Sequence, residues 1–192
     1  MSATTVRPDL LLRPAQTLAW VLLTAAIVIV YRRIFGVYFL NEDFIWLRVC
    51  RFLPGRGLWT LLTHDVMVGR YSWRPLVQVS FAVNQWLGGL NPFGYRFEVL
   101  LWQVISAFVL YGIVCRVGDA PRALVAALLF AVHPLQVESL AWTCARGGPI
   151  STAFLLLAVL AYLRWRRGGH AVWVAMPFGF AMATQENSVV LF

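Results

Sequence analysis

The chain has 192 residues, of which 60% are hydrophobic and only 12% are charged, and its mean hydropathy is +0.73. A soluble core of this size cannot bury so much apolar surface, so the composition excludes a soluble globular domain and predicts an all-α membrane protein. The net charge of +8 comes from arginine alone, because the chain contains no lysine, and the arginines lie between apolar runs. Basic residues spread in this way argue against a nucleic-acid-binding surface.

The first apolar run covers residues 15–31 and predicts a membrane anchor. The preceding residues, 1–14, carry Arg7 and Arg13 and lack the cleavage pattern of a signal peptide, so we expect the run to be retained. About 17 residues is near the lower limit for crossing the hydrocarbon core. Two arginines follow at positions 32 and 33, where their long side chains would reach the interface.

Residues 41–92 break into short apolar pieces separated by proline and glycine, and no piece is long enough to cross a membrane. Within this loop, residues 44–53 have arginine on one side and apolar groups on the other, which predicts a helix lying in the interface. Residues 58–62 predict a second short helix. The segment is therefore interpreted as a structured loop rather than a linker.

Four further apolar runs predict four more spans, so we expect about five spans in the bundle. These runs cover residues 94–117, 122–142, 150–163 and 170–192. Pro134 lies inside the third run and is expected to kink that helix, because proline removes a hydrogen bond and clashes with the preceding turn. The last run is still apolar at Phe192. We therefore expect residues 1–192 to be the amino-terminal part of a larger membrane domain and to be inactive alone.

The arginines predict the orientation of the spans. Those near the short loops gather on the amino-terminal side of the membrane, and they are Arg7, Arg13, Arg116, Arg122, Arg164, Arg166 and Arg167. Only Arg146 lies in the opposite short loop. Since positive charge marks the cytoplasmic side, the amino terminus should be cytoplasmic and residues 41–92 extracytoplasmic. We expect the membrane to be the bacterial inner (plasma) membrane.

Two adjacent carboxylates, Glu42 and Asp43, stand just after the first span. They could form an ordinary helix start, with Asn41 as the N-cap and both acids in the first turn, where they favour the helix dipole. The alternative is a carboxylate pair held at the height where a lipid-borne substrate is exposed. The three cysteines, Cys50, Cys115 and Cys144, are isolated, so they predict neither a zinc site nor a disulfide framework.

Two further stretches carry a family resemblance. The first joins Tyr71-Ser72-Trp73-Arg74-Pro75-Leu76 to residues 89–95, and the second runs from Phe130 to Trp142 and is closed by Arg146. Together they resemble the GT-C class of polyprenyl-phosphate-sugar-dependent glycosyltransferases, and within it the protein O-mannosyltransferase-like members that often carry tetratricopeptide repeats downstream. The resemblance covers residues 18–190.

The resemblance implies an enzyme that moves a sugar from a polyprenyl phosphate to a hydroxyl on a protein or glycan acceptor at the extracytoplasmic face. In such a reaction a carboxylate takes the acceptor's proton and arginine holds the departing phosphate. Asp43 is the expected base, and Glu42 is its nearest substitute. The expected substrate- and phosphate-binding residues are Arg74, Arg146, His133, Glu138 and Glu186.

Several of these residues also have a structural interpretation. His133 and Glu138 could satisfy backbone groups freed by the proline, and Arg74 could pair with lipid headgroups. Glu42 and Asp43 could ligate a divalent metal, but two acids make an incomplete shell, so no metal or other cofactor is predicted.

The chain also departs from the family pattern. Gln185 stands where the family often has lysine, Gln136 where many members have a second histidine, and Gly148 in a pair that is commonly more polar. These departures leave a non-catalytic relative as the alternative, acting as a transporter-like protein or an assembly subunit. A transporter would be expected to show a second, repeated half, which these residues lack.

Overall fold

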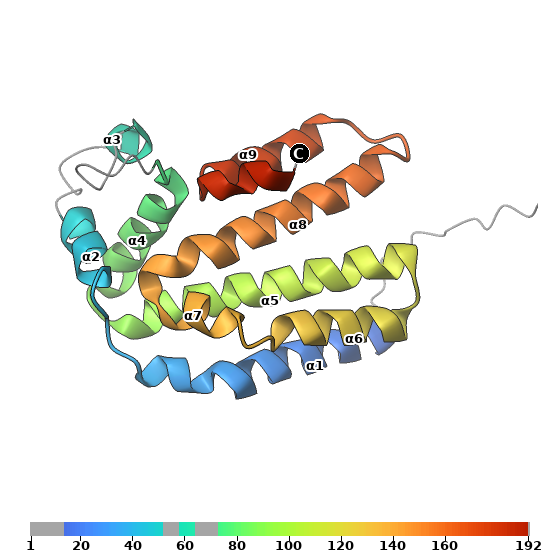
Figure 1. Ribbon diagram of the computed structural model, residues 1–192, viewed down its shortest axis with the longest axis horizontal. Helices are drawn as coiled ribbons and strands as arrows, with labels where there is room; N and C mark the ends of the chain where they lie inside the picture. The colour runs from blue at the N-terminus through green and yellow to red at the C-terminus, as the bar shows by residue number, and fades with distance from the viewer. Residues whose placement is uncertain (1–13, 52–57, 64–72, 192) are drawn as a thin grey trace, which may run out of the picture.

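The computed structural model describes residues 14–51, 58–63 and 73–191, and every regular element in these ranges is helical (Figure 1). Nine α-helices are present in these ranges: α1 Pro14–Tyr31, α2 Asp43–Arg51, α3 Leu58–Thr63, α4 Pro75–Gly88, α5 Pro92–Val117, α6 Ala120–Ala131, α7 Gln136–Ala141, α8 Gly147–Trp165 and α9 Val172–Met182. Short 3-10 segments also occur: η1 Arg32–Gly36, η3 Thr143–Arg146 and η4 Glu186–Leu191. The all-α prediction is confirmed.

Three helical stretches are long and apolar enough to cross a membrane, namely Gln16–Gly36, Pro92–Val117 and Thr143–Trp165. Two shorter apolar helices, α6 and α9, accompany them in the described part of the chain. The membrane-bundle prediction is thus confirmed. Of the about five expected spans, three are long enough to cross the hydrocarbon core as single helices, whereas α6 and α9 are shorter.

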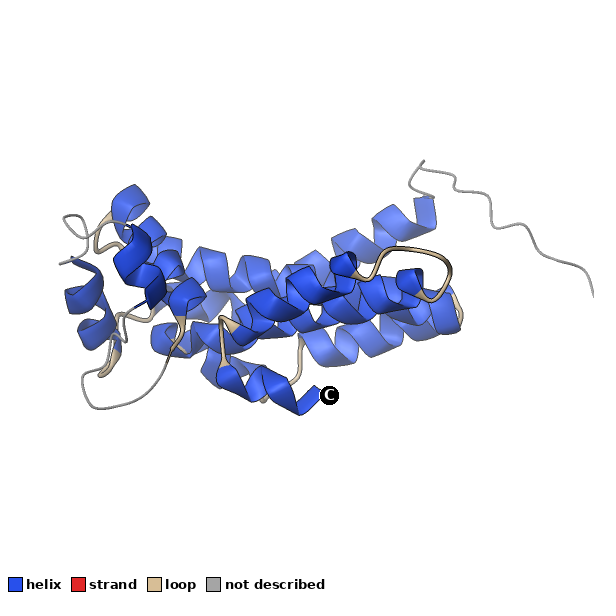
Figure 2. Cartoon of the chain, turned by 90° about the horizontal axis from the view of Figure 1, so that it is seen from above, coloured by secondary structure: helices blue, strands red, loops and turns tan. Residues whose placement is uncertain are grey.

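The long helices run lengthwise beside one another, while α2, α3 and α4 gather at one end of the bundle (Figures 1 and 2). The α5–α6 and α8–α9 connections lie at the opposite end. Arg116, Arg122 and Arg164 therefore share that end, since they stand in the last turn of α5, near the start of α6 and in the last turn of α8. Arg7 and Arg13 lie outside the described residues.

Helix α5 is central, and it packs against α1, α6 and α8. Small side chains at these contacts, such as the fully buried Ala107, Ala127 and Ala131, allow close approach of the helix backbones. Helices α2, α3 and α4 are called the end domain below. A separate aromatic cluster joins it to α5: Trp46 of α2 stacks on Phe81 of α4 with ring centroids 5.4 Å apart, and Phe81 packs on Tyr95 of α5 at 5.9 Å. The end domain is thereby packed directly onto the bundle.

The predicted third span is interrupted rather than kinked. Helix α6 ends at Ala131, and α7 begins only at Gln136. Proline disfavours the helical conformation in the residue before it, so His133 cannot continue α6 toward Pro134. The turn is closed instead by a hydrogen bond from Gln136 N to His133 O, at 3.0 Å. The expectation of one helix over residues 122–142 was wrong for this reason, and α7 follows the break nearer to the end of the bundle that holds α2, α3 and α4 (Figure 1).

The predicted last span also ends early, because α9 stops at Met182 and the chain then turns into η4. The backbone after α9 contacts the start of α4, where Leu76 N donates to Ala183 O at 3.2 Å. In the loop, the two expected short helices are present as α2 and α3, although residues 52–57 lie outside the described ranges. Helix α4 was not anticipated from the sequence.

Candidate functional site

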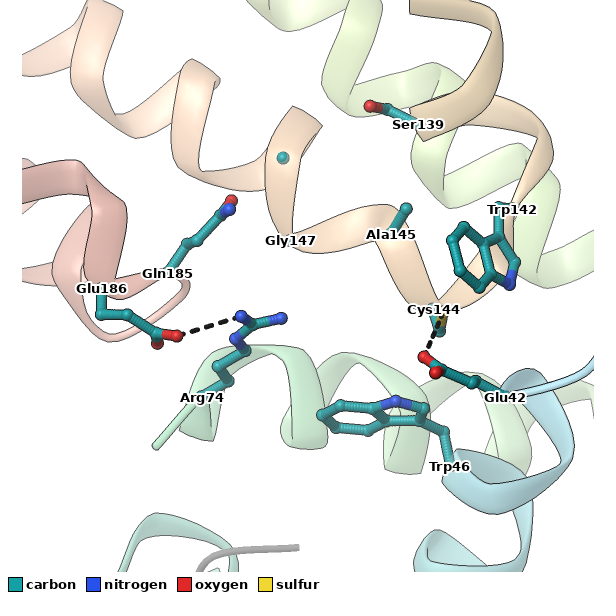
Figure 3. Close-up of a pocket in the computed structure, with 11 residues that line it drawn as sticks. Glu42, Trp46, Arg74, Ser139, Trp142, Cys144, Ala145, Gly147, Gln185 and Glu186 are labelled. Atoms are coloured by element: carbon teal, nitrogen blue, oxygen red, sulfur yellow. Dashed lines mark hydrogen bonds and ion pairs between the residues drawn. The ribbon is translucent and has the colours of Figure 1, made fainter. Parts of the chain in front are cut away.

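A cavity of about 510 Å³ lies where the end domain meets α7, α8 and the segment after α9 (Figure 3). Its lining residues come from four separate parts of the chain: Glu42, Trp46, Arg74, Ser139, Trp142, Cys144, Ala145, Gly147, Gly148, Gln185 and Glu186. The cavity therefore exists only after tertiary folding has brought these segments together.

Glu42 stands on one wall, immediately before α2. Its carbonyl accepts from Ile45 N at 3.0 Å, so the helix starts directly at the acid pair. Its Oε2 lies 3.9 Å from Cys144 Sγ (Figure 3). The helix-start interpretation was correct for Asp43, which lies in the first turn of α2. Asn41 instead adopts a left-handed turn with φ of 36°, a conformation that asparagine tolerates better than most residues.

Asp43 is completely buried and fastens this wall to its neighbour. Its Oδ2 accepts from Leu40 N at 3.0 Å, and its Oδ1 accepts from Cys144 N at 2.6 Å. The second bond joins α2 to η3 across about a hundred residues of sequence. Asp43 is not among the residues that line the cavity, whereas Glu42 is.

Arg74 stands on the facing wall, at the residue that precedes α4. Its Nη2 lies 3.1 Å from Glu186 Oε1, and the two side chains are 29% and 52% exposed (Figure 3). The amino-terminal end of α4 adds a partial positive charge beside the guanidinium. The structure thus brings Glu42, Arg74 and Glu186 together around one cavity.

Arg146 is completely buried behind the cavity wall. Its Nη1 donates to Ser80 Oγ at 2.8 Å and to Glu98 Oε2 at 3.1 Å, while its Nε donates to Thr143 O at 3.0 Å. The guanidinium also stacks on Phe81, 3.9 Å from the ring centroid. Arg146 is therefore close to the cavity but held within the protein.

His133 and Glu138 are exposed and are not among the lining residues. His133 Nδ1 accepts from Leu135 N at 3.2 Å, which matches the interpretation that it satisfies a backbone group freed near Pro134. Of the positions that depart from the family pattern, Gly148 and Gln185 line the cavity, whereas Gln136 does not.

Sequence reasoning missed Trp46, Ser139, Trp142 and Glu98. The first three are lining residues, and Glu98 holds Arg146. Glu98 is an acid inside the apolar run 94–117, and an ionisable residue in such a run is a signal of function that could have been used. Among the residues that the structure describes, no group of three or more histidine, cysteine, aspartate and glutamate side chains is arranged to hold a metal ion.

Comparison with known proteins finds related sequences in animals. The mouse protein O-mannosyl-transferase TMTC1 is 32% identical over 170 residues, which is 82% of this chain and 18% of the relative. The mouse protein O-mannosyl-transferase TMTC2 is 35% identical over 106 residues, or 55% of this chain and 12% of the relative. Drosophila melanogaster Tmtc1, which has the same descriptive name, is 34% identical over 123 residues, or 62% of this chain and 14% of the relative.

These matches span less than a fifth of each relative's length. No protein-family model matches the chain, and no solved structure matches it. The alignment nevertheless covers most of this chain in the longest of these matches. The chain is thus similar in sequence to the protein O-mannosyl-transferases, so the predicted resemblance to protein O-mannosyltransferase-like proteins is confirmed.

Proposed function

We propose that this chain forms the acid-and-arginine part of the active site of a GT-C-type glycosyltransferase, which moves a sugar from a polyprenyl phosphate to a hydroxyl acceptor on the extracytoplasmic face. The observation that carries the proposal is the cavity that places Glu42 on one wall and Arg74 with Glu186 on the other. The names of the relatives support a sugar-transfer reaction, and the apolar helices support a lipid-borne donor.

In the proposed reaction, the acceptor oxygen attacks the anomeric carbon of the sugar while the bond from that carbon to the phosphate oxygen breaks. The acceptor's proton passes to a carboxylate, and the polyprenyl phosphate leaves with the negative charge. Arg74 is the proposed partner for that charge, because a guanidinium can hold two phosphate oxygens at once. The sugar is thereby transferred without any further reactant.

The geometry favours Glu42 over Asp43 as the proton acceptor. Asp43 is completely buried, and each of its oxygens already accepts a backbone N–H. Glu42 lines the cavity, where an acceptor hydroxyl could approach it. We therefore propose that Glu42 is the general base and that Asp43 fixes the cavity wall by its two hydrogen bonds. The family resemblance instead implies Asp43 as the base and Glu42 as its substitute.

Transfer from a labelled polyprenyl-phosphate sugar, measured in membranes that contain the complete protein, tests this assignment. Glu42→Gln should lower kcat by about 10² to 10⁴-fold, because an amide cannot take the proton. Asp119→Asn is a matched control, since asparagine can still cap α6 and the position lies at the far end of the bundle. Normal transfer by Glu42→Gln would show that Glu42 is not the base.

A non-catalytic relative is the second candidate, and the identity of two lining residues favours it. Gln185 and Gly148 both line the cavity, and both depart from the family pattern. If the wild-type protein transfers no sugar, Gln185→Lys is the informative variant, because it adds a second cation beside Arg74 and Glu186. Transfer gained by that variant would identify a degenerate site, while continued inactivity would favour a role without catalysis.

We further propose that the end domain faces the extracytoplasmic side and that the arginine-bearing end of the bundle faces the cytoplasm. The shared location of Arg116, Arg122 and Arg164 at one end supports this orientation. The cavity would then open on the side where the sugar is transferred.

A further inference from the structure

Glu98 is an acid on α5 that receives hydrogen bonds from four side chains yet does not line the cavity. Ser80 Oγ lies 2.7 and 2.9 Å from its two oxygens, Trp102 Nε1 donates at 3.2 Å, and Arg146 Nη1 donates at 3.1 Å. Asn84 Nδ2 completes the set. A carboxylate with this many donors is held in one orientation.

Through Arg146, this carboxylate connects both walls of the cavity. The guanidinium bonds Ser80 of α4, the helix that begins beside Arg74. The same guanidinium bonds Thr143 O within η3, the turn that carries Cys144. Glu98 therefore holds the Arg146 guanidinium, and this guanidinium joins α4, the helix that follows Arg74, to η3, the turn that contacts Asp43.

The connection continues from η3 to the acid pair. Thr143 is completely buried, and the next residue, Cys144, donates its backbone N–H to Asp43 Oδ1 at 2.6 Å. A four-residue turn has little freedom to move one residue without the next, so release of Arg146 would shift the Cys144 N–H. Asp43, and Glu42 beside it, would then keep the packing of α2 on α4 but lose the contact with η3 that fixes their wall from the other side.

We propose that Glu98 is a positioning residue, which acts through Arg146 to set the distance between the Glu42 wall and the Arg74 wall. The proposal rests on the function proposed above. Arg146 is completely buried and the Glu98 side chain is 22% exposed. A largely buried ion pair of this kind is a poor way to gain stability, because apolar replacements of such pairs are often neutral or stabilising. Stability alone therefore does not explain why Glu98 and Arg146 form an ion pair between α4, α5 and η3, whereas a positioning role does.

Glu98→Gln tests the proposal in the complete protein. The amide presents a donor toward a cluster of donors and weakens the hold on Arg146, so kcat should fall by about 10²-fold, as expected for misplacement of reacting groups by about 1 Å. KM for the lipid donor should stay within about twofold, because Arg74 itself is unchanged. A rise in KM with unchanged kcat would overturn the positioning role.

Asp119→Asn is again the matched control, because it makes the same acid-to-amide change at the far end of the bundle, where asparagine can still cap α6. Transfer by this variant should remain near the wild-type rate. If Glu98→Gln does not fold, Ser80→Ala takes its place, because it cuts the link between α4 and Arg146 with almost no change in volume. Wild-type kcat for Ser80→Ala would contradict the proposal.

Hydrogen–deuterium exchange separates this proposal from the proposed function. In Glu98→Gln, or in its substitute Ser80→Ala, backbone amides of residues 143–147 should exchange faster, while those in the middle of α5 and α8 keep their protection. This readout needs no transfer activity. An inactive wild-type protein would refute the proposed function, and the exchange rates over residues 143–147 would still test the positioning role. Unchanged exchange over residues 143–147 would refute the positioning role whatever the transfer rate.

Discussion

The ion pair between Arg74 and Glu186 stands where the donor phosphate is proposed to bind, so phosphate and carboxylate would compete for one guanidinium. The pair is partly exposed, and exposed pairs are worth roughly 0–1 kcal/mol. Glu186→Gln keeps the shape but removes the competing charge. We expect KM for the donor to fall by up to about fivefold, measured from initial transfer rates over a range of donor concentrations.

Arg74→Ala supplies the comparison for that measurement, because it removes the proposed phosphate partner itself. Its KM for the donor should rise, opposite in sign to the effect of Glu186→Gln. A higher KM in Glu186→Gln would mean that Glu186 holds Arg74 in its working position rather than competing with phosphate.

Glu138 is a site residue from the family resemblance that is exposed and does not line the cavity. On geometry alone, we expect Glu138→Gln to change kcat/KM by less than about threefold, as for a surface substitution of about 0.5 kcal/mol. The same transfer assay checks this. A large loss would show that the substrate extends from the cavity to the exposed side of α7, and His133→Ala should then be affected as well.

At the scale of single helices, the break between α6 and α7 positions one wall of the cavity. Ser139 and Trp142 line the cavity from α7 and the residue after it, and α7 takes its direction at Pro134. Pro134→Ala removes the block to helix continuation. We expect α6 to extend, α7 to turn away, and kcat/KM to fall by at least about tenfold.

Pro177→Ala is the control for that variant, because Pro177 lies inside α9 and its removal leaves a continuous helix. Circular dichroism of both purified variants should show no loss of helix. Wild-type transfer by Pro134→Ala would mean that contacts of α7 with α5 and α8, rather than the proline, direct this helix.

At the scale of the whole molecule, orientation in the membrane is the property most open to a direct test. Single cysteines at Thr63 in α3 and at Ala120 at the start of α6 would stand at opposite ends of the bundle. Ala120 is preferred to its neighbour Asp119, which caps α6 by accepting from Arg122 N at 2.9 Å. We expect only Thr63→Cys to react with a membrane-impermeant maleimide added from outside.

The background for this labelling replaces Cys50, Cys115 and Cys144 with serine or alanine, and permeabilised membranes show that both introduced thiols can react. Labelling of Ala120→Cys from outside would reverse the proposed orientation. It would also place the cavity on the cytoplasmic side, where the proposed extracytoplasmic transfer could not occur.

The sequence by itself determined the class of fold, the two short loop helices and the positions of three long apolar helices. These were predicted at residues 15–31, 94–117 and 150–163, and the structure extends them to 14–36, 92–117 and 143–165. These features follow from local composition and apolar length, which a chain carries before it folds. The same local information identified Glu42, Arg74 and Glu186 as site candidates through the family resemblance. It could not find the ends of α6 and α9, because proline and turn geometry outweighed continuous hydropathy there.

Only the tertiary structure decided which candidates share a cavity. Glu42, Arg74 and Glu186 are far apart in sequence and meet because the chain turns after α9 and contacts the start of α4. Arg146 appeared equivalent to Arg74 in the sequence, yet Glu98, Ser80 and Phe81 hold it behind the wall. Burial and hydrogen-bond partners depend on which helices pack together, and that long-range arrangement separates a residue exposed to substrate from one that holds the site in place.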